Sequence, residues 1–297
     1  MNLFVFGLGY SALNFVLKHQ QDFASVAGTV TDPGKKAHLI EAGIEAYIFS
    51  NDEADPQIAD ALAKADIVLV SIPPGDNGDP VLVKYALPLF RAASMRKIIY
   101  LSTVGVYGDR GGAWVDETSL PMTTNPRSLM RLAVENLWRA LAREGDRNLY
   151  VLRLSGIYGP GRNALVQLQK GTAKRLIKPG QVFNRIHVED IVQAIGLCCQ
   201  RDAGTEDAKP EDLVFNITDN EPAPAQDVVA YAASLLEVEP PPEIDFETAD
   251  LTEMARSFYD ECKRVSNKAA RQQLNFKPLY PSYREGMRAL WAAGEGR

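Results

Sequence analysis

Apolar and polar positions along the first two-thirds of the chain follow two periods in alternation. Short apolar runs, typical of buried strands, alternate with segments in which apolar residues recur at helical spacing. The runs cover residues 2–7, 25–30, 45–49, 66–72, 97–103 and 149–159, and the helical segments cover 11–20, 35–43, 55–65, 80–95 and a stretch that begins at 125. Apolar strands separated by helices indicate a parallel sheet covered on both faces. The pattern therefore predicts an α/β, Rossmann-like doubly wound fold.

The regular alternation weakens after residue 160, where turn-rich segments appear. A helix over 187–200 and a strand over 213–219 interrupt this region, and we expect both to return to the sheet. The predicted domains are a Rossmann domain formed by 1–157 together with 186–219, and a smaller C-terminal substrate lobe formed by 158–185 and 220–297. We expect the lobe to lie over the carboxyl edge of the sheet.

Composition narrows the classes of function. The 297-residue chain is 46% hydrophobic and carries a net charge of −6 at pH 7, which argues against general binding to nucleic acid or anionic membranes. Its three cysteines form no C-x-x-C pair and suggest neither a disulfide framework nor a zinc site. We expect no signal peptide, and the sequence contains no apolar stretch of about 18 residues. We expect a cytoplasmic protein that binds a small molecule, anionic or neutral, and no metal, nucleic acid or membrane. Homo-oligomerisation stays open.

The first predicted strand ends in a glycine-rich turn with the pattern of a dinucleotide site. Gly7, Gly9 and Ala12 form G-x-G-x-x-A between an apolar strand and a helix, with Tyr10 and Ser11 inside the motif. In this context the first glycine allows the tight turn, the second lets backbone approach a pyrophosphate, and the third position lets helix and strand pack closely. The phosphates would lie on the helix N-terminus. The alternative is a turn without a ligand.

An acidic residue stands where a dinucleotide site binds the adenosine ribose. Asp32 ends the second strand, and its carboxylate suits the ribose hydroxyls or, alternatively, caps the next helix. Asp32 would repel a 2′-phosphate, so the sequence favours NAD over NADP. Thr31, Lys35 and Lys36 would bind that phosphate if Asp32 turned away. The other candidate cofactor-binding residues are Asp52 after the third strand, for which a helix cap is an equal alternative, and Ser71 and Pro73 at the end of the fourth.

With these residues in place, the chain resembles the extended and atypical short-chain dehydrogenases/reductases of the NAD-dependent epimerase/dehydratase superfamily. Six segments carry the resemblance in family order: GLGYSA (7–12), YLSTVGVYGD (100–109), LRLSGIYGPGRN (152–163), RIHVEDIVQAI (185–195), FNITDNEP (215–222) and KRVSNKAARQQLNF (263–276). The resemblance covers nearly the whole chain. It implies oxidoreductase or epimerase/dehydratase chemistry with NAD or NADP on a small or nucleotide-linked hydroxy or keto substrate. It also implies that Thr103 polarises the substrate oxygen.

The chain departs from the family at the helix that begins at 125. In the family, a Tyr-x-x-x-Lys motif supplies a Tyr that exchanges a proton with the substrate and a Lys that lowers the Tyr pKa and holds the nicotinamide ribose. Matching RLAVE (131–135) to the usual Lys-x-x-x-Glu places Arg127 at the Tyr and Arg131 at the Lys. Arginine keeps its proton in proteins, so Arg127 is excluded as a general acid or base. Asp79 is the nearest candidate for the family's upstream Asn.

Two interpretations of the arginine pair stay open. In the structural one, both lie on a solvated helix face, with Arg131 bonded to Glu135 and Glu135 bonded to Arg139. In the functional one, Arg127 binds an acidic substrate and Arg131 contacts the cofactor, because guanidinium groups bind phosphates and carboxylates in a bidentate manner.

Several other side chains have both a functional and a structural interpretation. Tyr107 and Tyr158 could supply a phenol, and His187 could titrate near neutrality, but packing is favoured for all three. Arg162 and Arg185 are candidates for binding a substrate phosphate. The spacing of Arg185 from His187 differs from that in nucleotide-sugar epimerases.

Two classes of function follow from these patterns. The missing Tyr and Lys favour a non-enzymatic NAD(P)-binding sensor or regulatory protein. Thr103, the YGPGRN segment (158–163) and the predicted lobe favour an enzyme, because a sensor has no need of a substrate pocket. We expect the enzyme class, in which another residue or water moves the proton.

Overall fold

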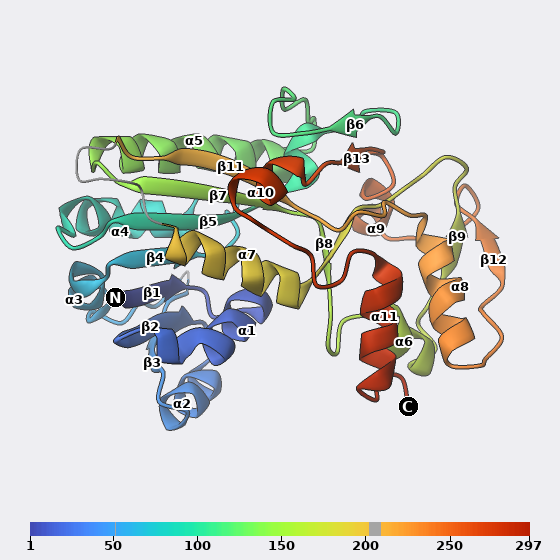
Figure 1. Cartoon of the computed structure of the whole chain (residues 1–297), viewed down its shortest axis with the longest axis horizontal. Coiled ribbons are helices and arrows are strands. Elements are labelled where there is room, and N and C mark those ends of the chain that lie inside the picture. Colours follow the sequence, from blue (N-terminus) through green and yellow to red (C-terminus); the bar gives the residue numbers. More distant parts are fainter. Residues whose placement is uncertain (51, 202–208) are drawn as a thin grey trace. The chain divides into compact units, whose positions relative to one another are not determined.

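The computed structural model describes residues 1–50, 52–201 and 209–297, and in them the chain forms two compact units, whose elements are labelled in Figure 1. The first unit consists of Met1–Thr103, Asn125–Arg153 and Ile191–Phe215, and the second of Val104–Thr124, Leu154–Asp190 and Asn216–Arg297. The chain therefore passes between the units repeatedly. The apolar pattern of the sequence does not indicate that residues 104–124 belong to the second unit.

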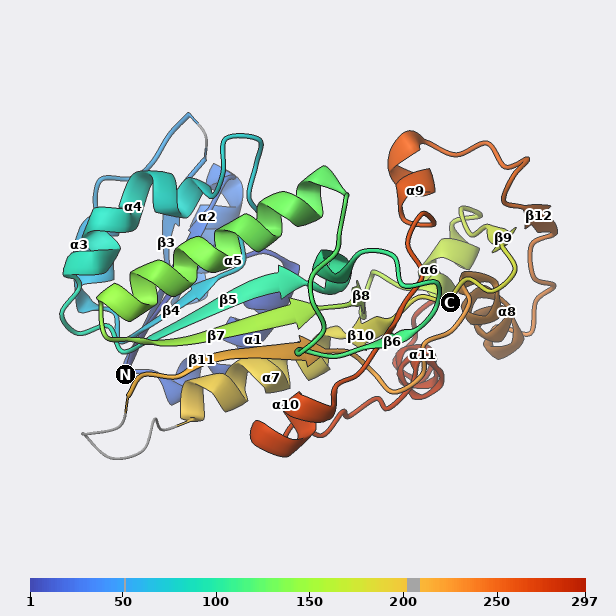
Figure 2. The ribbon, with the colours of Figure 1, turned by 90° about the horizontal axis from the view of Figure 1, so that it is seen from above.

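The first unit is built on a seven-stranded sheet with the strand order β11-β7-β5-β4-β1-β2-β3. The strands are β1 (Asn2–Phe6), β2 (Ser25–Val30), β3 (Glu45–Ile48), β4 (Ile67–Val70), β5 (Lys97–Thr103), β7 (Asn148–Leu154) and β11 (Asp212–Ile217). The pairs β1–β2, β1–β4, β2–β3 and β4–β5 are parallel, and Figure 2 shows β5, β7 and β11 pointing the same way. The predicted α/β, Rossmann-like doubly wound fold is confirmed.

Helices cover both faces of this sheet. They are α1 (Tyr10–His19), α2 (Pro33–Glu41), α3 (Ile58–Lys64), α4 (Pro80–Arg91), α5 (Pro126–Glu144) and α7 (Val188–Gln200), with the short 3-10 helix η1 (Gln20–Asp22) after α1. α3, α4 and α5 lie on one face and α1 and α7 on the other (Figure 2). Buried aromatic side chains, among them Phe6, Tyr85 and Trp138, fill the core beneath α3, α4 and α5.

The strand order places a ligand site at one edge of the sheet. β1 lies between β2 and β4, so the direction in which the chain adds strands reverses there. In open α/β sheets, ligands bind at the carboxyl ends of the strands at such a switch point. Gly7, Thr31 and Ser71 follow the carboxyl ends of these three strands.

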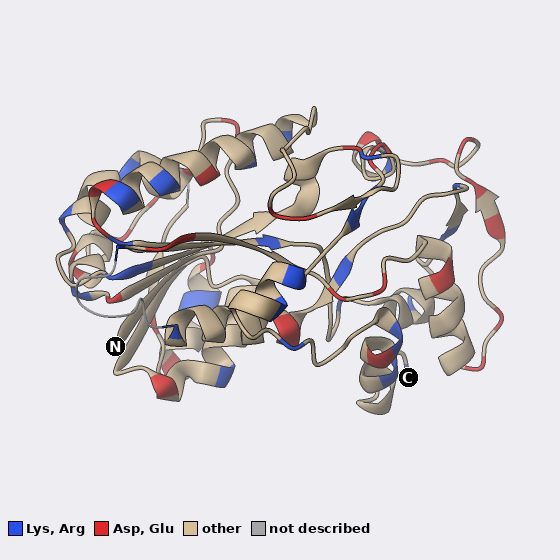
Figure 3. Cartoon of the chain, turned by 45° about the horizontal axis from the view of Figure 1, so that its top comes forward, with Lys and Arg blue, Asp and Glu red and all other residues tan. Residues whose placement is uncertain are grey.

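Charged residues lie mainly on helices and loops, and the strands of the sheet are largely without them (Figure 3). Lys97 and Arg153 are charged residues buried on these strands. The ammonium of Lys97 donates to the carbonyl oxygen of Cys199 at 2.6 Å, where it stabilises the C-terminal turn of α7. Arg153 forms an ion pair with Glu135 of α5.

The second unit is built from short elements. They are η2 (Val104–Tyr107), β6 (Trp114–Val115), β8 (Gly156–Tyr158), α6 (Ala164–Gln169), β9 (Arg175–Ile177), β10 (Arg185–His187), α8 (Ala225–Leu235), β12 (Glu243–Asp245), α9 (Glu253–Ser257), β13 (Arg264–Val265), α10 (Lys268–Gln273) and α11 (Tyr283–Ala292). The strands form the parallel pairs β8–β10, β9–β12 and β6–β13. Apolar side chains from α6, α8 and α11 pack with Tyr158 into a separate core.

The single strand predicted over 149–159 is divided in two. β7 ends at Leu154 and β8 begins at Gly156, and β8 pairs with β10 instead of with the large sheet. Ser155 N–H donates to Ile217 O at 3.2 Å, whereas Gly156 N–H donates to Asn184 O at 3.0 Å. The hydrogen-bond partner therefore changes within one apolar run, and hydrophobic periodicity cannot show such a change.

Candidate functional site

The turn after β1 requires glycine at position 7. Gly7 has a φ of +88°, and a side chain there would place its Cβ 2.7 Å from Ile72 Cγ1. Gly7 N–H donates to Thr29 Oγ1 at 2.8 Å, and the Ser71 hydroxyl donates to Gly7 O at 2.6 Å. The turn is thus held from β2 on one side and from the end of β4 on the other.

Gly9 leaves the start of α1 open. It is the N-cap residue of α1 and has no side chain to accept from the first-turn N–H groups. A Cβ built at Gly9 meets no heavy atom within 4 Å among the described residues. Ala12 is fully buried, Ser11 is buried and Tyr10 is half-buried. An uncapped helix N-terminus beside open space fits the pyrophosphate of a dinucleotide.

Asp32 and the two lysines beside it make contacts within the protein. Asp32 is exposed and caps α2, and its Oδ1 accepts from Lys35 N–H at 2.6 Å. The Lys35 ammonium donates to Leu8 O of the glycine turn at 2.6 Å. The Lys36 ammonium forms an ion pair with Asp55 at 2.7 Å. Both lysines considered for a 2′-phosphate are therefore engaged elsewhere.

The remaining predicted cofactor-binding residues on the loops after β2, β3 and β4 are Thr31, Asp52 and Pro73, and all three are exposed. Asp52 N–H donates to the Ser50 hydroxyl at 3.3 Å. The next helix, α3, begins at Ile58 with Gln57 as its N-cap. The interpretation of Asp52 as a helix cap is therefore wrong.

Thr103 is the last residue of β5, and Arg131 of α5 binds the strand just before it. The Arg131 Nη1 group donates to Leu101 O at 3.0 Å and to Tyr100 Oη at 3.2 Å. Tyr100 is fully buried, and burial raises its pKa to about 12, although the nearby Arg131 charge acts in the opposite direction. Arg131 is thus tied to the protein's own backbone at the carboxyl end of β5.

Glu135, one helical turn after Arg131, is fully buried, and its main partner is Arg153 of β7. Arg153 Nη2 lies 2.7 Å from Glu135 Oε2, and Arg153 Nε donates to Oε1 at 3.1 Å. The Ser102 hydroxyl donates to Oε1 at 2.5 Å, and Arg139 Nη2 is 3.8 Å from Oε2. The expected bond between Arg131 and Glu135 is wrong, because Arg131 binds β5 and Arg153 supplies the countercharge.

Arg127 has different surroundings from Arg131. It lies in the first turn of α5, and its side chain is exposed. The Asn125 side-chain oxygen accepts from Arg127 N–H at 3.0 Å and from Ser128 N–H at 3.4 Å, and Pro126 follows at the first helical position. This cap explains why the helix begins at the Asn-Pro pair.

Asp79, proposed above in place of the family's Asn, joins α4 to α5. It is 2% exposed, and its Oδ1 accepts from Val81 N–H at 2.8 Å and from Leu82 N–H at 3.2 Å at the start of α4. Its Oδ2 accepts from Trp138 Nε1–H at 2.9 Å. Burial raises the pKa of Asp79, while the bonds from Trp138 and the helix N–H groups lower it. These contacts favour a structural role.

The two candidate phenols lie in the second unit and are buried. Tyr107 is fully buried, and its hydroxyl donates to Asn216 Oδ1 at 2.8 Å. Tyr158 packs edge-on against His187, with ring centroids 5.1 Å apart, and a side chain at Gly286 would overlap its hydroxyl. Burial raises the pKa of Tyr158. Both environments favour the structural interpretation.

The other candidates of the second unit differ in exposure. Arg162 is exposed, in the loop before α6. Arg185 Nη1 donates to Phe183 O at 3.0 Å and to Ala223 O at 2.9 Å. His187 is 2% exposed, and burial lowers its pKa to about 4, so its imidazole is neutral near pH 7. These contacts favour packing for His187, whereas Arg162 lies at the surface.

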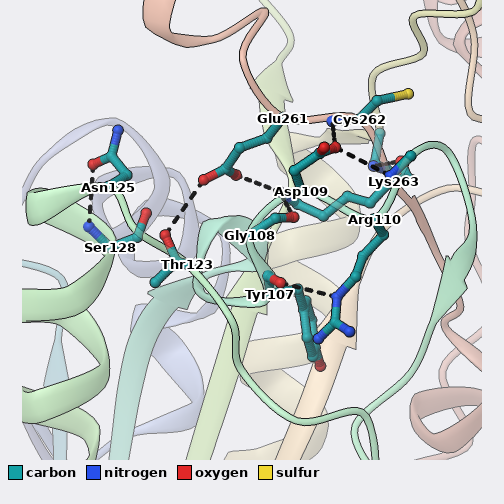
Figure 4. A network of polar contacts seen from close by, with 12 residues as sticks. Tyr107, Gly108, Asp109, Arg110, Thr123, Asn125, Ser128, Glu261, Cys262 and Lys263 are labelled. Carbon is teal, nitrogen blue, oxygen red and sulfur yellow. Dashed lines mark hydrogen bonds and ion pairs between the residues drawn. The ribbon is translucent and has the colours of Figure 1, made fainter.

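Lys263 and Glu261, which the sequence pattern does not single out, form the centre of a polar network in the second unit (Figure 4). The Lys263 ammonium donates to Gly108 O at 2.9 Å and to Glu261 Oε2 at 2.5 Å. The Thr123 hydroxyl donates to Glu261 Oε1 at 3.3 Å. Gly108 lies 155 residues before Lys263 in the chain, and Thr123 lies 138 residues before Glu261. Local spacing could not have shown these contacts.

Two further features bear on the class of site. Among the described residues, no group of three or more His, Cys, Asp or Glu side chains is placed to hold a metal ion. Within the same part of the chain, every helix is too short or too polar to cross a membrane. The three cysteines are free thiols, of which Cys198 and Cys199 are buried.

Comparison with known proteins agrees with this architecture. A family model for the NAD dependent epimerase/dehydratase family matches residues 81–217. The chain is 28% identical over 248 residues to Protein YeeZ of Escherichia coli (strain K12), covering 80% of this chain and 84% of YeeZ. A solved structure of a functionally unknown conserved protein from Silicibacter pomeroyi is 41% identical, covers 99% of both chains and has a TM-score of 0.87.

A more distant solved structure carries ligands. It is UDP-glucuronic acid 4-epimerase from Bacillus cereus in complex with UDP-glucuronic acid and NAD. It shares 18% identity with this chain, covers 98% of both chains and has a TM-score of 0.75. At this level of identity, the likeness shows a common fold.

Proposed function

We propose that the chain is a member of the NAD-dependent epimerase/dehydratase family, whose family model matches residues 81–217, and that it binds NAD and acts on a nucleotide-linked hydroxy or keto substrate without the family's Tyr/Lys pair. The observation that carries this proposal is the start of α1, where Gly9 leaves the first-turn N–H groups uncapped and its Cβ direction open. Glycine at this point is needed when a pyrophosphate approaches the backbone. A turn that served packing alone would have no reason to keep this space open.

The contacts around Asp32 support NAD over NADP. Among the described residues, the Asp32 carboxylate uses Oδ1 for Lys35 N–H, which leaves Oδ2 for ribose hydroxyls. The ammonium groups of Lys35 and Lys36 are engaged by Leu8 O and Asp55, so a 2′-phosphate would have to displace one of these contacts. When bound, NAD supplies the hydride acceptor of the reaction.

Thr103 is the proposed catalytic residue, and its hydroxyl would donate a hydrogen bond to the reacting substrate oxygen. Arg127, exposed at the start of α5, would bind an anionic group of the substrate and keep its own proton. The proton of the reaction is moved by another group or by water. The likeness to a Bacillus cereus epimerase with bound UDP-glucuronic acid supports a nucleotide sugar as the substrate class.

A non-enzymatic NAD sensor is the second candidate function. The replacement of the family's Tyr by an arginine favours it, and so does the burial of Tyr107 and Tyr158. Calorimetry with NAD, followed by an assay of nucleotide sugars and keto compounds with NAD(H) absorbance as readout, separates the two. Turnover of any member of this panel supports the enzyme. Tight binding of NAD with no turnover across the panel supports the sensor.

We further propose that the protein forms a homo-oligomer through α4 and α5. α4 exposes Val83, Leu87 and Phe90 at helical spacing, and α5 exposes Leu129 and Leu137 two turns apart. Side chains at such spacing lie on one face of a helix, and contiguous exposed apolar patches are typical of interaction surfaces. Sedimentation of wild type and of Leu87→Asp tests this proposal. An oligomer that Leu87→Asp converts to a monomer is expected, and a monomeric wild type would contradict it.

A further inference from the structure

We propose that Arg131 is a positioning residue, which holds the carboxyl end of β5, and with it Thr103, against α5. This inference rests on the proposed role of Thr103 as the residue that contacts the substrate. In this role Arg131 differs from the lysine at the matching position in the family, because the side chain of Arg131 contacts the protein itself.

The end of β5 lacks support from β4. The pairing of β5 with β4 runs from Lys97 to Tyr100, where β4 ends at Val70. Leu101, Ser102 and Thr103 therefore extend beyond the last rung of that ladder. On its other side β5 is hydrogen-bonded to β7, so the rungs that the strand end lacks are those toward β4. A strand end with fewer backbone partners opens more readily than the strand interior. Contacts from the helix α5 to Leu101 and Ser102 would therefore add to what holds the strand end that leads to Thr103.

Two side chains of α5 supply that contact. Arg131 Nη1 carries two N–H bonds, and they match two acceptors, Leu101 O at 3.0 Å and Tyr100 Oη at 3.2 Å. One turn later, Glu135 accepts from the Ser102 hydroxyl at 2.5 Å. The two residues before Thr103 are thus fastened to one helix, the first through its backbone and the second through its side chain.

The surroundings of Arg131 explain why an arginine is suited to this position. Its Cζ lies 5.8 Å from the centre of the Tyr100 ring, and the Tyr100 ring stacks on Trp138 with centroids 6.1 Å apart. Among the described residues, no carboxylate lies within ion-pair distance of Arg131, so its direct partners are a carbonyl and a phenol. A planar guanidinium bridges two such acceptors, whereas a lysine ammonium is a point charge on a flexible stem.

Hydrogen exchange distinguishes this role from that of a cofactor ligand. Backbone exchange over 97–103 is measured by mass spectrometry in wild type, in Arg131→Met and in Tyr100→Phe. The matched control is Arg143→Met, an exposed arginine three turns further along the same helix. Loss of a charged hydrogen bond should speed exchange at the end of β5 by about tenfold in Arg131→Met. A smaller increase is expected in Tyr100→Phe and none in the control.

Calorimetry with NAD on the same variants completes the test. A positioning residue leaves the Kd for NAD within about twofold of wild type, since the bound cofactor is not its partner. Unchanged exchange in Arg131→Met together with a tenfold weaker Kd would assign Arg131 to the cofactor and overturn the proposal. If Arg131→Met does not fold, the test rests on Tyr100→Phe. Unchanged exchange over 97–103 in Tyr100→Phe would then overturn the positioning role of Arg131. If wild type binds no NAD, the proposed function is wrong, but the hydrogen-exchange data still show whether Arg131 holds the end of β5.

Discussion

Ser102 and Glu135 are joined by a hydrogen bond of 2.5 Å from a strand hydroxyl to a carboxylate that is fully buried. The charge of that carboxylate is balanced by Arg153, whose Nη2 lies 2.7 Å away on the neighbouring strand β7. One glutamate of α5 therefore binds two strands of the sheet at once. The arrangement links the stability of the first unit to the geometry of the strand that ends in Thr103.

Removal of the Arg153 side chain should lower the free energy of unfolding. Arg153→Met leaves the Glu135 carboxylate buried without its countercharge, and breaking a buried pair in this way costs about 3–5 kcal/mol. Urea unfolding measures the loss. Arg139→Met is the matched control, since Arg139 is partly exposed and 3.8 Å from the same carboxylate, so it should lose at most about 1 kcal/mol. Equal losses in the two variants would show that Arg153 is not the main partner.

Substitution of the two glycines in the turn after β1 should affect different properties: Gly9 the binding of NAD, and Gly7 the folding of the chain. Gly9 has an extended backbone and open space beyond its Cβ, so Gly9→Val should keep the wild-type circular dichroism spectrum and lose NAD binding in calorimetry. Gly7→Val should fail to fold stably, because position 7 needs a positive φ and its Cβ would overlap Ile72. NAD affinity that is unchanged in Gly9→Val would refute the cofactor site.

Cofactor choice should depend on the end of β2. Asp32→Ser combined with Thr31→Arg removes a repulsive carboxylate and adds a bidentate phosphate ligand, while serine can still cap α2. The ratio of Kd values for NAD and NADP should move toward NADP in this variant. The single change Asp32→Ser separates the two effects. Wild-type protein that already binds NADP about tenfold better than NAD would contradict the preference for NAD.

Thr103 and Arg127 should affect different kinetic constants. Thr103→Val keeps the shape of the side chain but removes the hydroxyl, so kcat should fall by about a hundredfold or more. Arg127→Ala should raise KM and leave kcat nearly unchanged, because an arginine that only binds substrate contributes equally before and during the chemical step. Steady-state kinetics on the best substrate of the panel measures both. A large loss of kcat in Arg127→Ala would contradict its role in binding.

Asp219 should make the stability of the protein depend on pH. Asp219 is 1% exposed, and burial raises its pKa from 3.8 to about 8. Between these values the folded state holds a proton that the unfolded state has released, so the free energy of unfolding falls as pH rises from about 4 to about 8. Asp219→Asn carries no such proton. Its stability relative to wild type should therefore grow by several kcal/mol over this range in urea unfolding. A difference that stays constant with pH would show that Asp219 does not titrate there.

The sheet could be predicted from the sequence because its signals are local. Each buried strand is a short apolar run bounded by turn residues, and the G-x-G-x-x-A turn combines two signals within six residues. The break at Ser155 was missed, because the apolar run continues across it and only the hydrogen-bond partner changes.

The polar contacts of the candidate site were less accessible to sequence analysis. Helical spacing correctly places Arg131 and Glu135 on one side of α5, but it pairs them with each other. In the folded protein both point at β5, and Glu135 meets Arg153, which is 18 residues further along the chain. A helical spacing rule identifies neighbours on the same helix, whereas these partners are chosen by the packing of the helix on the sheet.

The loop 104–124 belongs to the second unit, although the chain on either side of it belongs to the first. On the ribosome, Trp114–Val115 of β6 emerges long before Arg264–Val265 of β13, with which it pairs. When β6 emerges, strands β1 to β5 have already been synthesised. The nascent chain then carries part of the sheet together with a loop whose partner strand, β13, has not yet been synthesised. Incomplete chains of this kind expose apolar surface and unpaired strand edges. Translation that stops before residue 264 would thus release a product in which the first unit has the strands of its sheet, while β6 of the second unit lacks its partner strand β13.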